Sequence, residues 1–167
     1  MKVIKTLALL TGLTTAQMSL AEPMSIVNLE PITHATAALV VVDPQGNETS
    51  YTPQELEQFS TLRLVTTTPW RTEAAEFDGI LLSELLAEHG LEDSAIKVTA
   101  ENDFSTVFSS ELINTVNVLI ATRVNGRAHS RRERGPIQFV IDEAEHGTSQ
   151  LVSESHFVWM AARIERQ

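Results

Sequence analysis

The chain has 167 residues, with 22 acidic and 12 basic side chains, a net charge of −10, and no cysteine. Such an acidic protein repels nucleic acid and anionic lipid at long range, so neither is expected as a partner. The missing cysteine excludes disulfides, thiolate metal ligands, redox pairs and a cysteine nucleophile.

The N-terminal end has the pattern of a secretory signal peptide. Lys2 and Lys5 form a short basic start, and an apolar stretch follows over residues 6–16. Ser19-Leu20-Ala21 then supplies the small residues of a cleavage site before Glu22. A retained anchor is the alternative, but the apolar stretch is shorter than the roughly 20 residues that cross a bilayer. We therefore expect a cleaved signal peptide over residues 1–21 and a periplasmic protein that is not membrane-embedded.

The remaining residues, 22–167, are enough for one ordinary domain with a real core. Residues 22–36 show no clear period and contain Pro23 and Pro31, so we expect a partly ordered lead-in. No internal repeat, low-complexity tract or linker between domains is visible. The sequence therefore predicts a single folded unit after export.

The first predicted elements are a strand, a turn and a short helix. Residues 37–42 end in the β-branched run Val40–Val42, and the turn residues 43–47 follow them, so a strand enters a hairpin there. Thr52 can cap a helix that has Pro53 at its first position and Glu55 where a capping box requires it. This helix should end near Phe59.

A strand and a second helix are predicted next. Residues 62–68 alternate and are rich in Thr and Val, which indicates a strand that ends at Pro69-Trp70. After Phe77-Asp78-Gly79, the apolar residues between Ile80 and Leu86 have helical spacing, and Gly90 is expected to end that helix.

The second half of the chain is rich in predicted strands. These cover residues 95–100, 104–108, 116–124, 137–141 and 157–164, with a turn at 101–103, a helical turn at 111–113 and polar loops at 127–134 and 142–155. Asn125-Gly126 is the commonest two-residue hairpin signal. Strands and short helices without strict alternation predict an α+β fold with a mixed or antiparallel sheet.

Five arginines within twelve positions form the strongest charge feature of this acidic chain: Arg123, Arg127, Arg131, Arg132 and Arg134. Guanidinium groups bind phosphate or carboxylate with two parallel hydrogen bonds, which lysine cannot do. Gly135 follows the cluster and allows the backbone to approach a ligand. The sequence leaves two interpretations open, a site for a small anion or a surface loop paired with the protein's own carboxylates.

Other candidate groups are weaker. Trp70 follows a strand-ending proline and either lines a pocket or packs in the core, while Trp159 is expected in a core strand. The acidic segment 142–146 offers oxygen and imidazole ligands, but it matches no defined metal loop, so a solvated acidic loop is the simpler interpretation. The five histidines are scattered, and no catalytic motif or metal site is predicted.

An ordered set of segments resembles the oxidoreductase molybdopterin-binding domain family of the sulfite-oxidase type, especially its small exported members. The resemblance covers roughly Thr52 to Arg166 and depends on Thr68-Pro69-Trp70, Phe77-Asp78-Gly79-Ile80-Leu81-Leu82 with Leu85-Leu86, Ala100-Glu101-Asn102-Asp103-Phe104, Leu119-Ile120-Ala121, Asn125-Gly126, Arg134-Gly135-Pro136-Ile137, and Phe157-Val158-Trp159-Met160 with Ile164. It implies a mixed sheet around a cleft for a molybdopterin cofactor.

The resemblance also shows where this chain departs from the enzymes. In the full enzymes a cysteine thiolate binds molybdenum, and this chain has no cysteine. The tyrosine that often follows Asn-Asp is Phe104 here.

Three functional hypotheses follow. The first is a non-catalytic binding module for a small anionic or pterin-like ligand that reports to a membrane-bound sensor or redox partner. In it, Arg132 and Arg134 bind the charge, Trp70 and Asn102 fix the plane of the ligand, and Asp103 and Gly135 complete the cleft. The second is a molybdopterin-dependent oxidoreductase or a subunit of one. The third is an interaction protein without a small ligand.

Overall fold

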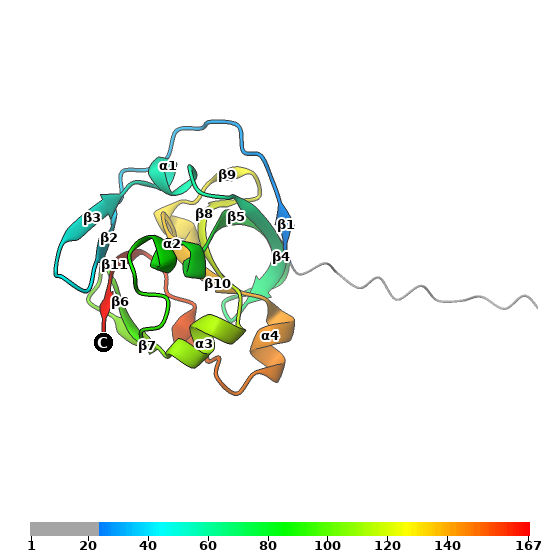
Figure 1. The fold of residues 1–167 in the computed structure, drawn as a ribbon. Helices are drawn as coiled ribbons and strands as arrows, with labels where there is room; N and C mark the ends of the chain where they lie inside the picture. The colour runs from blue at the N-terminus through cyan, green and yellow to red at the C-terminus, as the bar shows by residue number, and fades with distance from the viewer. Residues whose placement is uncertain (1–23) are drawn as a thin grey trace, which may run out of the picture.

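Two β-sheets form the fold that the computed structural model describes for residues 24–167 (Figure 1). The first sheet has the order β1-β4-β5-β8-β10, with β9 paired to β8. Its strands are β1 (Ser25–Ile26), β4 (Leu62–Thr68), β5 (Arg71–Leu81), β8 (Val118–Val124), β9 (Arg127–Ala128) and β10 (Gln138–Ile141). The predicted signal peptide and its cleavage point lie outside the described residues.

The second sheet has the order β3-β2-β11-β6-β7. Its strands are β2 (Leu39–Val42), β3 (Glu48–Tyr51), β6 (Ile96–Ala100), β7 (Ser105–Phe108) and β11 (Ala161–Arg166). Strands β2 and β11 run parallel, and the other pairs described are antiparallel. The predicted α+β class with mixed and antiparallel pairing is therefore confirmed.

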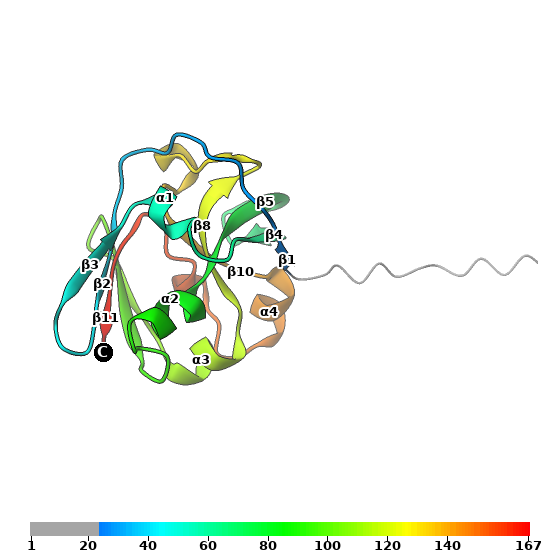
Figure 2. The same ribbon diagram turned by 45° about the horizontal axis from the view of Figure 1, so that its top comes forward.

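Short helices connect the strands. They are α1 (Pro53–Leu56), α2 (Leu82–Glu88), α3 (Ser110–Thr115) and α4 (Glu143–Thr148), with single 3₁₀ turns η1 (Arg131–Glu133) and η2 (Glu154–His156). Turning the molecule shows α2 and α3 beside the two sheets and the lead-in passing over α1 on its way from β1 to β2 (Figure 2). Within residues 24–167, no helix has both the length and the apolar character needed to span a bilayer.

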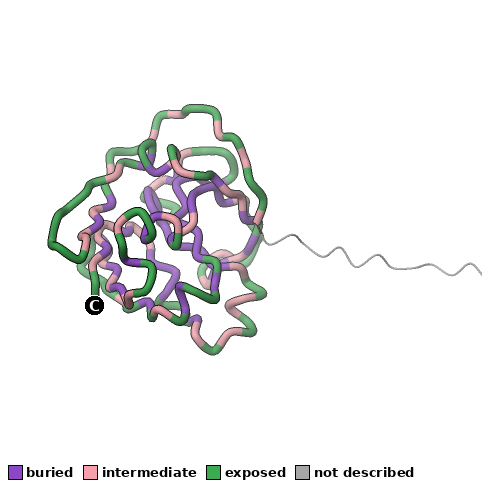
Figure 3. Tube along the Cα trace, in the orientation of Figure 1, coloured by how far each residue is buried: buried purple, intermediate pink, exposed green. Residues whose placement is uncertain are grey.

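Strand β8 is the centre of the core because all seven of its residues are buried (Figure 3). Successive side chains of a strand point to opposite faces. Accordingly, Val118 and Ile120 join the large core cluster that contains residues of both sheets and of α2 and α3. Leu119 and Ala121 join a smaller cluster with Phe77 on the other face. The strand predicted over residues 116–124 is therefore confirmed for Val118–Val124.

Several local predictions are confirmed by the structure. Thr52 and Glu55 form the expected capping box at the start of α1. Asn125 and Gly126 take positive φ angles of 49° and 71°, and Val124 pairs with Arg127 across this hairpin. Gly90 ends α2 with a φ of 64°. These predictions are correct because hydrogen bonds and backbone angles within a few residues determine the local structure.

The expected start of the second helix is wrong. Ile80 and Leu81 belong to β5, where they pair with Ile120 and Leu119, and α2 begins only at Leu82. The apolar residues between Ile80 and Leu86 belong partly to the end of β5 and partly to α2. Their spacing therefore combines the period of a strand with that of a helix. Pairing with the central strand overrides the local helical pattern because it buries Ile80 completely.

Gly79 marks the closest approach of two strands. A Cβ atom at this position would lie 2.0 Å from the carbonyl oxygen of Ile120. We expect Gly79→Ala to destabilise the protein by about 1–3 kcal/mol, because β5 must move away from β8. Urea denaturation would measure this loss. Gly147→Ala is the matched control, since nothing lies within 4 Å of a Cβ built there; equal effects of the two changes would contradict the prediction.

Two predictions near the C-terminal end are also wrong. Residues 142–155 are not a loop, because they contain α4 and η2. Asp142 caps α4 by accepting a hydrogen bond from the Ala144 N–H. The last strand spans Ala161–Arg166 instead of residues 157–164, because Met160 has a φ of 52° and interrupts the extended backbone.

His156 is buried in a setting that favours its neutral form. Its Nδ1 accepts a hydrogen bond from the Ser153 N–H at 3.0 Å, and its Nε2 lies 3.1 Å from the Val107 carbonyl oxygen. The ring packs against Phe108 at 4.8 Å between centroids. Burial lowers the pKa of His156 below its ordinary 6.5, although the bond to Val107 acts in the opposite direction.

A loss of stability on mild acidification follows from this shift. A histidine with a depressed folded-state pKa gives its full stabilisation above the unfolded pKa and loses it as the pH falls further. We expect the free energy of unfolding to fall between about pH 7 and pH 5.5, above the range in which most carboxylates titrate. In urea denaturation, His156→Gln should show a smaller fall than the wild type; identical falls would contradict the assignment to His156.

Candidate functional site: an arginine-lined cavity beside two tryptophans

The loop after β9 builds one side of the candidate site. The Asn125-Gly126 turn reverses the chain, and η1 follows β9 with Arg131–Glu133. Arg134 has a φ of 80°, and the Gly135 N–H donates to the Ser130 carbonyl at 2.8 Å. These contacts close a tight loop that holds the arginine side chains at the edge of the sheet.

A cavity of about 260 Å³ lies between this loop and the ends of β4 and β5. Its lining residues come from two segments that are distant in sequence, β4 with β5 and η1 with β10: Thr68, Trp70, Arg71, Phe77, Arg132, Glu133, Arg134 and Gln138. Three lining residues are arginines and one is a glutamate. Arg71 and Glu133 form a long ion pair at 3.6 Å. The cavity is therefore positively charged within an acidic protein.

Arg134 is held by both tryptophans of the sequence. Its Cζ atom lies 4.9 Å from the centroid of the Trp70 ring and 5.0 Å from that of Trp159. The two ring centroids are 6.3 Å apart. A guanidinium over an indole face gains cation–π attraction, which restrains the arginine without neutralising its charge. Arg134 can therefore keep its capacity to bind an anion.

The two tryptophans do not behave as ordinary core residues. Trp70 is 41% exposed and lines the cavity, so it does not pack in the core, and its contact with a ligand stays a prediction. Trp159 is half-buried and lies before β11, joined to Gln138 by an isolated β-bridge. Its expected place within a core strand is wrong, because the left-handed backbone at Met160 separates it from β11.

The arginine cluster divides into two groups. Arg131 forms an ion pair with Glu101 and donates to the Thr36 carbonyl. Arg123 is buried and paired with Glu57. In contrast, neither Arg132 nor Arg134 has an ion pair among residues 24–167, and both line the cavity. Pairing with the protein's own carboxylates is thus seen for Arg123 and Arg131, while Arg127 has no ion pair among the described residues and lies outside the cavity lining. Anion binding by Arg132 and Arg134 stays a prediction.

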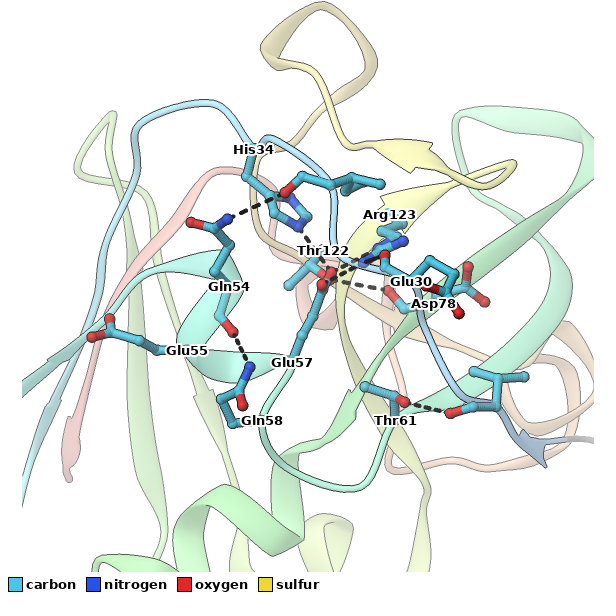
Figure 4. Close-up of polar contacts among 12 residues, drawn as sticks. Glu30, His34, Gln54, Glu55, Glu57, Gln58, Thr61, Asp78, Thr122 and Arg123 are labelled. Carbon is cyan, nitrogen blue, oxygen red and sulfur yellow. Dashed lines mark hydrogen bonds and ion pairs between the residues drawn. The ribbon is translucent and has the colours of Figure 1, made fainter.

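Arg123 belongs to a buried polar network below the lead-in (Figure 4). Its guanidinium donates to Glu57 at 2.6 and 2.9 Å and to the Glu30 carbonyl at 2.8 Å. The Thr122 hydroxyl donates to Glu57 Oε1 at 2.6 Å, and His34 Nε2 lies 3.0 Å from the same oxygen. Burial raises the pKa of Glu57, but the bonds from Arg123 and Thr122 outweigh it and the net pKa is lowered. This network is structural and lies apart from the cavity.

Asn102 and Asp103 lie outside the set of cavity-lining residues. Asn102 Oδ1 accepts a hydrogen bond from the Phe104 N–H at 3.2 Å, and Asp103 has a φ of 64°, so both shape a tight exposed turn. The turn is nevertheless tied to the site, because the Glu101 N–H donates to the Met160 carbonyl and Met160 donates to the Arg134 carbonyl. A contact of Asn102 or Asp103 with a ligand stays a prediction.

Gly135 lies directly behind Arg134 and packs on His129. A Cβ atom there would lie 2.6 Å from His129 Cγ and from its backbone. The glycine is therefore required for close packing below the cavity. Its approach to a ligand stays a prediction.

Five of the eight lining residues were not among the predicted site residues: Thr68, Arg71, Phe77, Glu133 and Gln138. Gln138 could have been found from the sequence, because it is a polar residue within the apolar run Ile137–Ile141. In the structure its side chain is only 2% exposed. Buried polar side chains have a hydrogen-bonding reason to be there. Arg71 gave no signal, because the fold alone brings the start of β5 to η1.

A second cavity, of about 350 Å³, also has Trp70 in its lining. Its lining is mainly aromatic and consists of Trp70, Phe104, Glu154, Ser155, Phe157 and Trp159. Trp70 is thus a wall shared by a charged cavity and an apolar one. A planar ligand with an anionic substituent would find both kinds of contact here.

The acidic segment 142–146 forms no metal site in this structure. Asp142 caps α4 and receives a bond from the Thr66 hydroxyl at 3.4 Å. Burial raises the pKa of Glu145, although a backbone hydrogen bond from Asn117 acts in the opposite direction. In the part of the chain that the structure describes, no group of three His, Cys, Asp or Glu side chains is placed to hold a metal ion.

No protein-family model matches the chain, and no curated protein matches it. Among solved structures, the fold is similar to that of the sulfane dehydrogenase SoxCD from Paracoccus pantotrophus, with a TM-score of 0.58 and 18% identity over 78% of this chain. The similarity covers 38% of the SoxCD chain, so this protein spans well under half of that length. At this identity the likeness shows the fold alone, in agreement with the α+β class.

The donor set does not fit a molybdenum centre held by a protein thiolate, because the sequence has no cysteine. The residues present fit other parts of a pterin cofactor. Arg132 and Arg134 suit an anionic group, and the Trp70 indole suits a planar ring. The resemblance to molybdopterin domains is thus compatible with ligand binding at this cavity and not with thiolate ligation of the metal.

Proposed function

We propose that this protein is an exported, non-catalytic binding module for a small anionic or pterin-like ligand. Arg132 and Arg134 bind the anionic group, and Trp70 stacks on the ring. The observation that carries the proposal is the pair of cavity-lining arginines without a carboxylate partner among the described residues. Arg131 of the same loop is paired with Glu101, and the exposed Arg127 lies outside the cavity lining, so Arg132 and Arg134 are the loop arginines available to a ligand in the cavity.

The likeness of fold to part of SoxCD supports a domain related to the sulfite-oxidase type, as the sequence resemblance implies. A retained fold with a cationic cavity and without cysteine favours binding over oxygen-atom transfer. We further propose that the mature protein acts in the periplasm and reports its ligand to a membrane-bound sensor or redox partner.

Ligand binding is tested on protein purified from the exported fraction. We expect mass spectrometry under native conditions to show a bound small anion or pterin, or a thermal melt to shift upward with inorganic phosphate or a pterin carboxylate. Both tryptophans flank Arg134, so quenching of intrinsic fluorescence reports the cavity directly. If neither probe binds and nothing co-purifies, the proposal fails.

Export is tested separately. N-terminal sequencing of the periplasmic protein should begin at Glu22, the residue after the predicted cleavage site. Material that stays in the cytoplasm with an intact N-terminus would contradict this part of the proposal and leave the binding result unaffected.

A molybdopterin-dependent oxidoreductase, or a subunit of one, is the second candidate, and the fold shared with part of a dehydrogenase favours it. Metal analysis of the purified protein separates the two. Stoichiometric molybdenum would support the oxidoreductase, whereas a metal-free protein that binds anions supports the binding module.

A further inference from the structure

A buried pair of polar side chains lies at the inner end of the arginine-lined cavity. Gln138 lines the cavity and is 2% exposed, and His129 behind it is 1% exposed. His129 Nε2 lies 2.7 Å from Gln138 Oε1. The cavity floor is therefore an amide whose orientation depends on this histidine.

The surroundings of the second ring nitrogen of His129, Nδ1, indicate which of the two nitrogens carries the proton. Nδ1 is buried and has no hydrogen-bond partner among the described residues. A buried N–H without an acceptor is rarer in proteins than an acceptor without a donor, so the proton belongs on Nε2. Burial also lowers the pKa of His129, which keeps the ring neutral with a single N–H. Nε2–H then donates to Gln138 Oε1.

The ring has little freedom to change this arrangement. Gly135 packs so closely that a Cβ atom there would lie 2.6 Å from His129 Cγ. On another side, Phe77 meets the ring edge-on at 6.3 Å between centroids. The histidine is thus fixed by packing, and the amide of Gln138 is fixed by the histidine.

We infer that Gln138, oriented by His129, presents its amide N–H₂ to the cavity and makes the floor of the anion site a hydrogen-bond donor. This inference rests on the proposed anion-binding function and narrows its ligand class. The group that reaches the floor is an oxyanion, such as a carboxylate or phosphate oxygen, which only accepts hydrogen bonds there. With the proton on Nδ1 instead, the amide would turn and present an acceptor, which suits a ligand N–H.

Long-range ¹H–¹⁵N correlation spectra of histidine-labelled protein test the orientation without any ligand. We expect the spectrum of His129 to show a neutral ring protonated on Nε2 at neutral pH. A ring protonated on Nδ1 would overturn the inference, because the amide would then face the cavity with its oxygen.

Binding of inorganic phosphate tests the donor itself. Gln138→Leu removes a hydrogen bond to a charged ligand, so it should weaken phosphate binding about tenfold. Gln138→Glu should weaken it about 100-fold, because the new carboxylate also repels the anion. Gln138→Glu keeps an acceptor for His129, so it should remain folded. Gln150→Glu adds the same charge at an exposed position and should change affinity less than about twofold.

The outcomes separate this inference from the proposed function. If the wild type binds phosphate and Gln138→Glu binds it equally well, Gln138 is not a donor to the ligand and the inference is overturned. If the wild type binds neither phosphate nor the pterin probe, the proposed function fails, and the spectrum of His129 still decides the amide orientation.

Discussion

Replacing Arg123 by leucine is expected to lower the free energy of unfolding by about 3–5 kcal/mol, because it leaves the carboxylate of Glu57 buried without its counter-charge. Both side chains are largely buried, with 5% and 8% of their surfaces exposed. The variant would lose two hydrogen bonds to Glu57 and one to the Glu30 carbonyl. Urea denaturation at neutral pH measures the change.

Matched variants separate the buried charge from the loss of side-chain volume. Arg127→Leu makes the same change at an exposed position of β9 and should alter stability by no more than about 0.5 kcal/mol. The double change Arg123→Leu and Glu57→Leu removes both charges and should recover part of the loss. A single Arg123 variant that is as stable as the Arg127 variant would contradict the network.

The network explains how the N-terminal lead-in becomes ordered. Residues 24–36 form only the two-residue strand β1, so few backbone bonds fix them. Instead, the lead-in contributes the Glu30 carbonyl and His34 to a cluster around Glu57, which follows α1 (Figure 4). The Thr61 hydroxyl adds a bond to the Val27 carbonyl. The lead-in is thus fixed by side-chain contacts with distant positions and not by regular secondary structure. Such contacts cannot be predicted from the periodicity of the sequence.

The sequence predicted those elements whose signals are local. The capping box of α1, the hairpin at Asn125-Gly126 and the strand β8 all depend on neighbours within a few residues or on a mainly apolar run. The long strand β5 was missed, because Arg71–Glu76 is polar and half of it is exposed. Its pairing with β4 and β8 on both sides makes it a strand, and this information lies elsewhere in the chain.

The candidate site was predictable to a similar degree. Arg132, Arg134 and Trp70 were expected from residue type and position, and all three line one cavity. Arg71 was not expected there, and it lines the cavity because β5 begins next to η1. Trp159 does not line this cavity, but its ring packs on Arg134 and its backbone bridges to Gln138. A site made at the ends of several strands can be located only once their pairing is known.

The double change Arg132→Gln and Arg134→Gln is expected to weaken binding of the anionic probe at least about 100-fold. Hydrogen bonds to charged groups contribute roughly 1.5–3 kcal/mol each, and about 1.4 kcal/mol corresponds to a factor of ten. Glutamine is shorter than arginine but stays polar, and the matched control below makes the same Arg→Gln change, so the comparison isolates the position of the lost charge. Isothermal titration calorimetry with the probe that binds the wild type measures the effect.

The control for this prediction must remove two charges without touching the cavity. Arg127→Gln with Arg166→Gln does so at exposed positions of β9 and β11. General electrostatic attraction would weaken in both double variants alike and would be screened by salt. A specific site requires that only the Arg132 and Arg134 variant loses binding, and that the loss persists at about 0.15 M salt. If the two variants lose affinity equally, the arginines act through net charge, and the cavity between Trp70 and Gln138 is not the binding site.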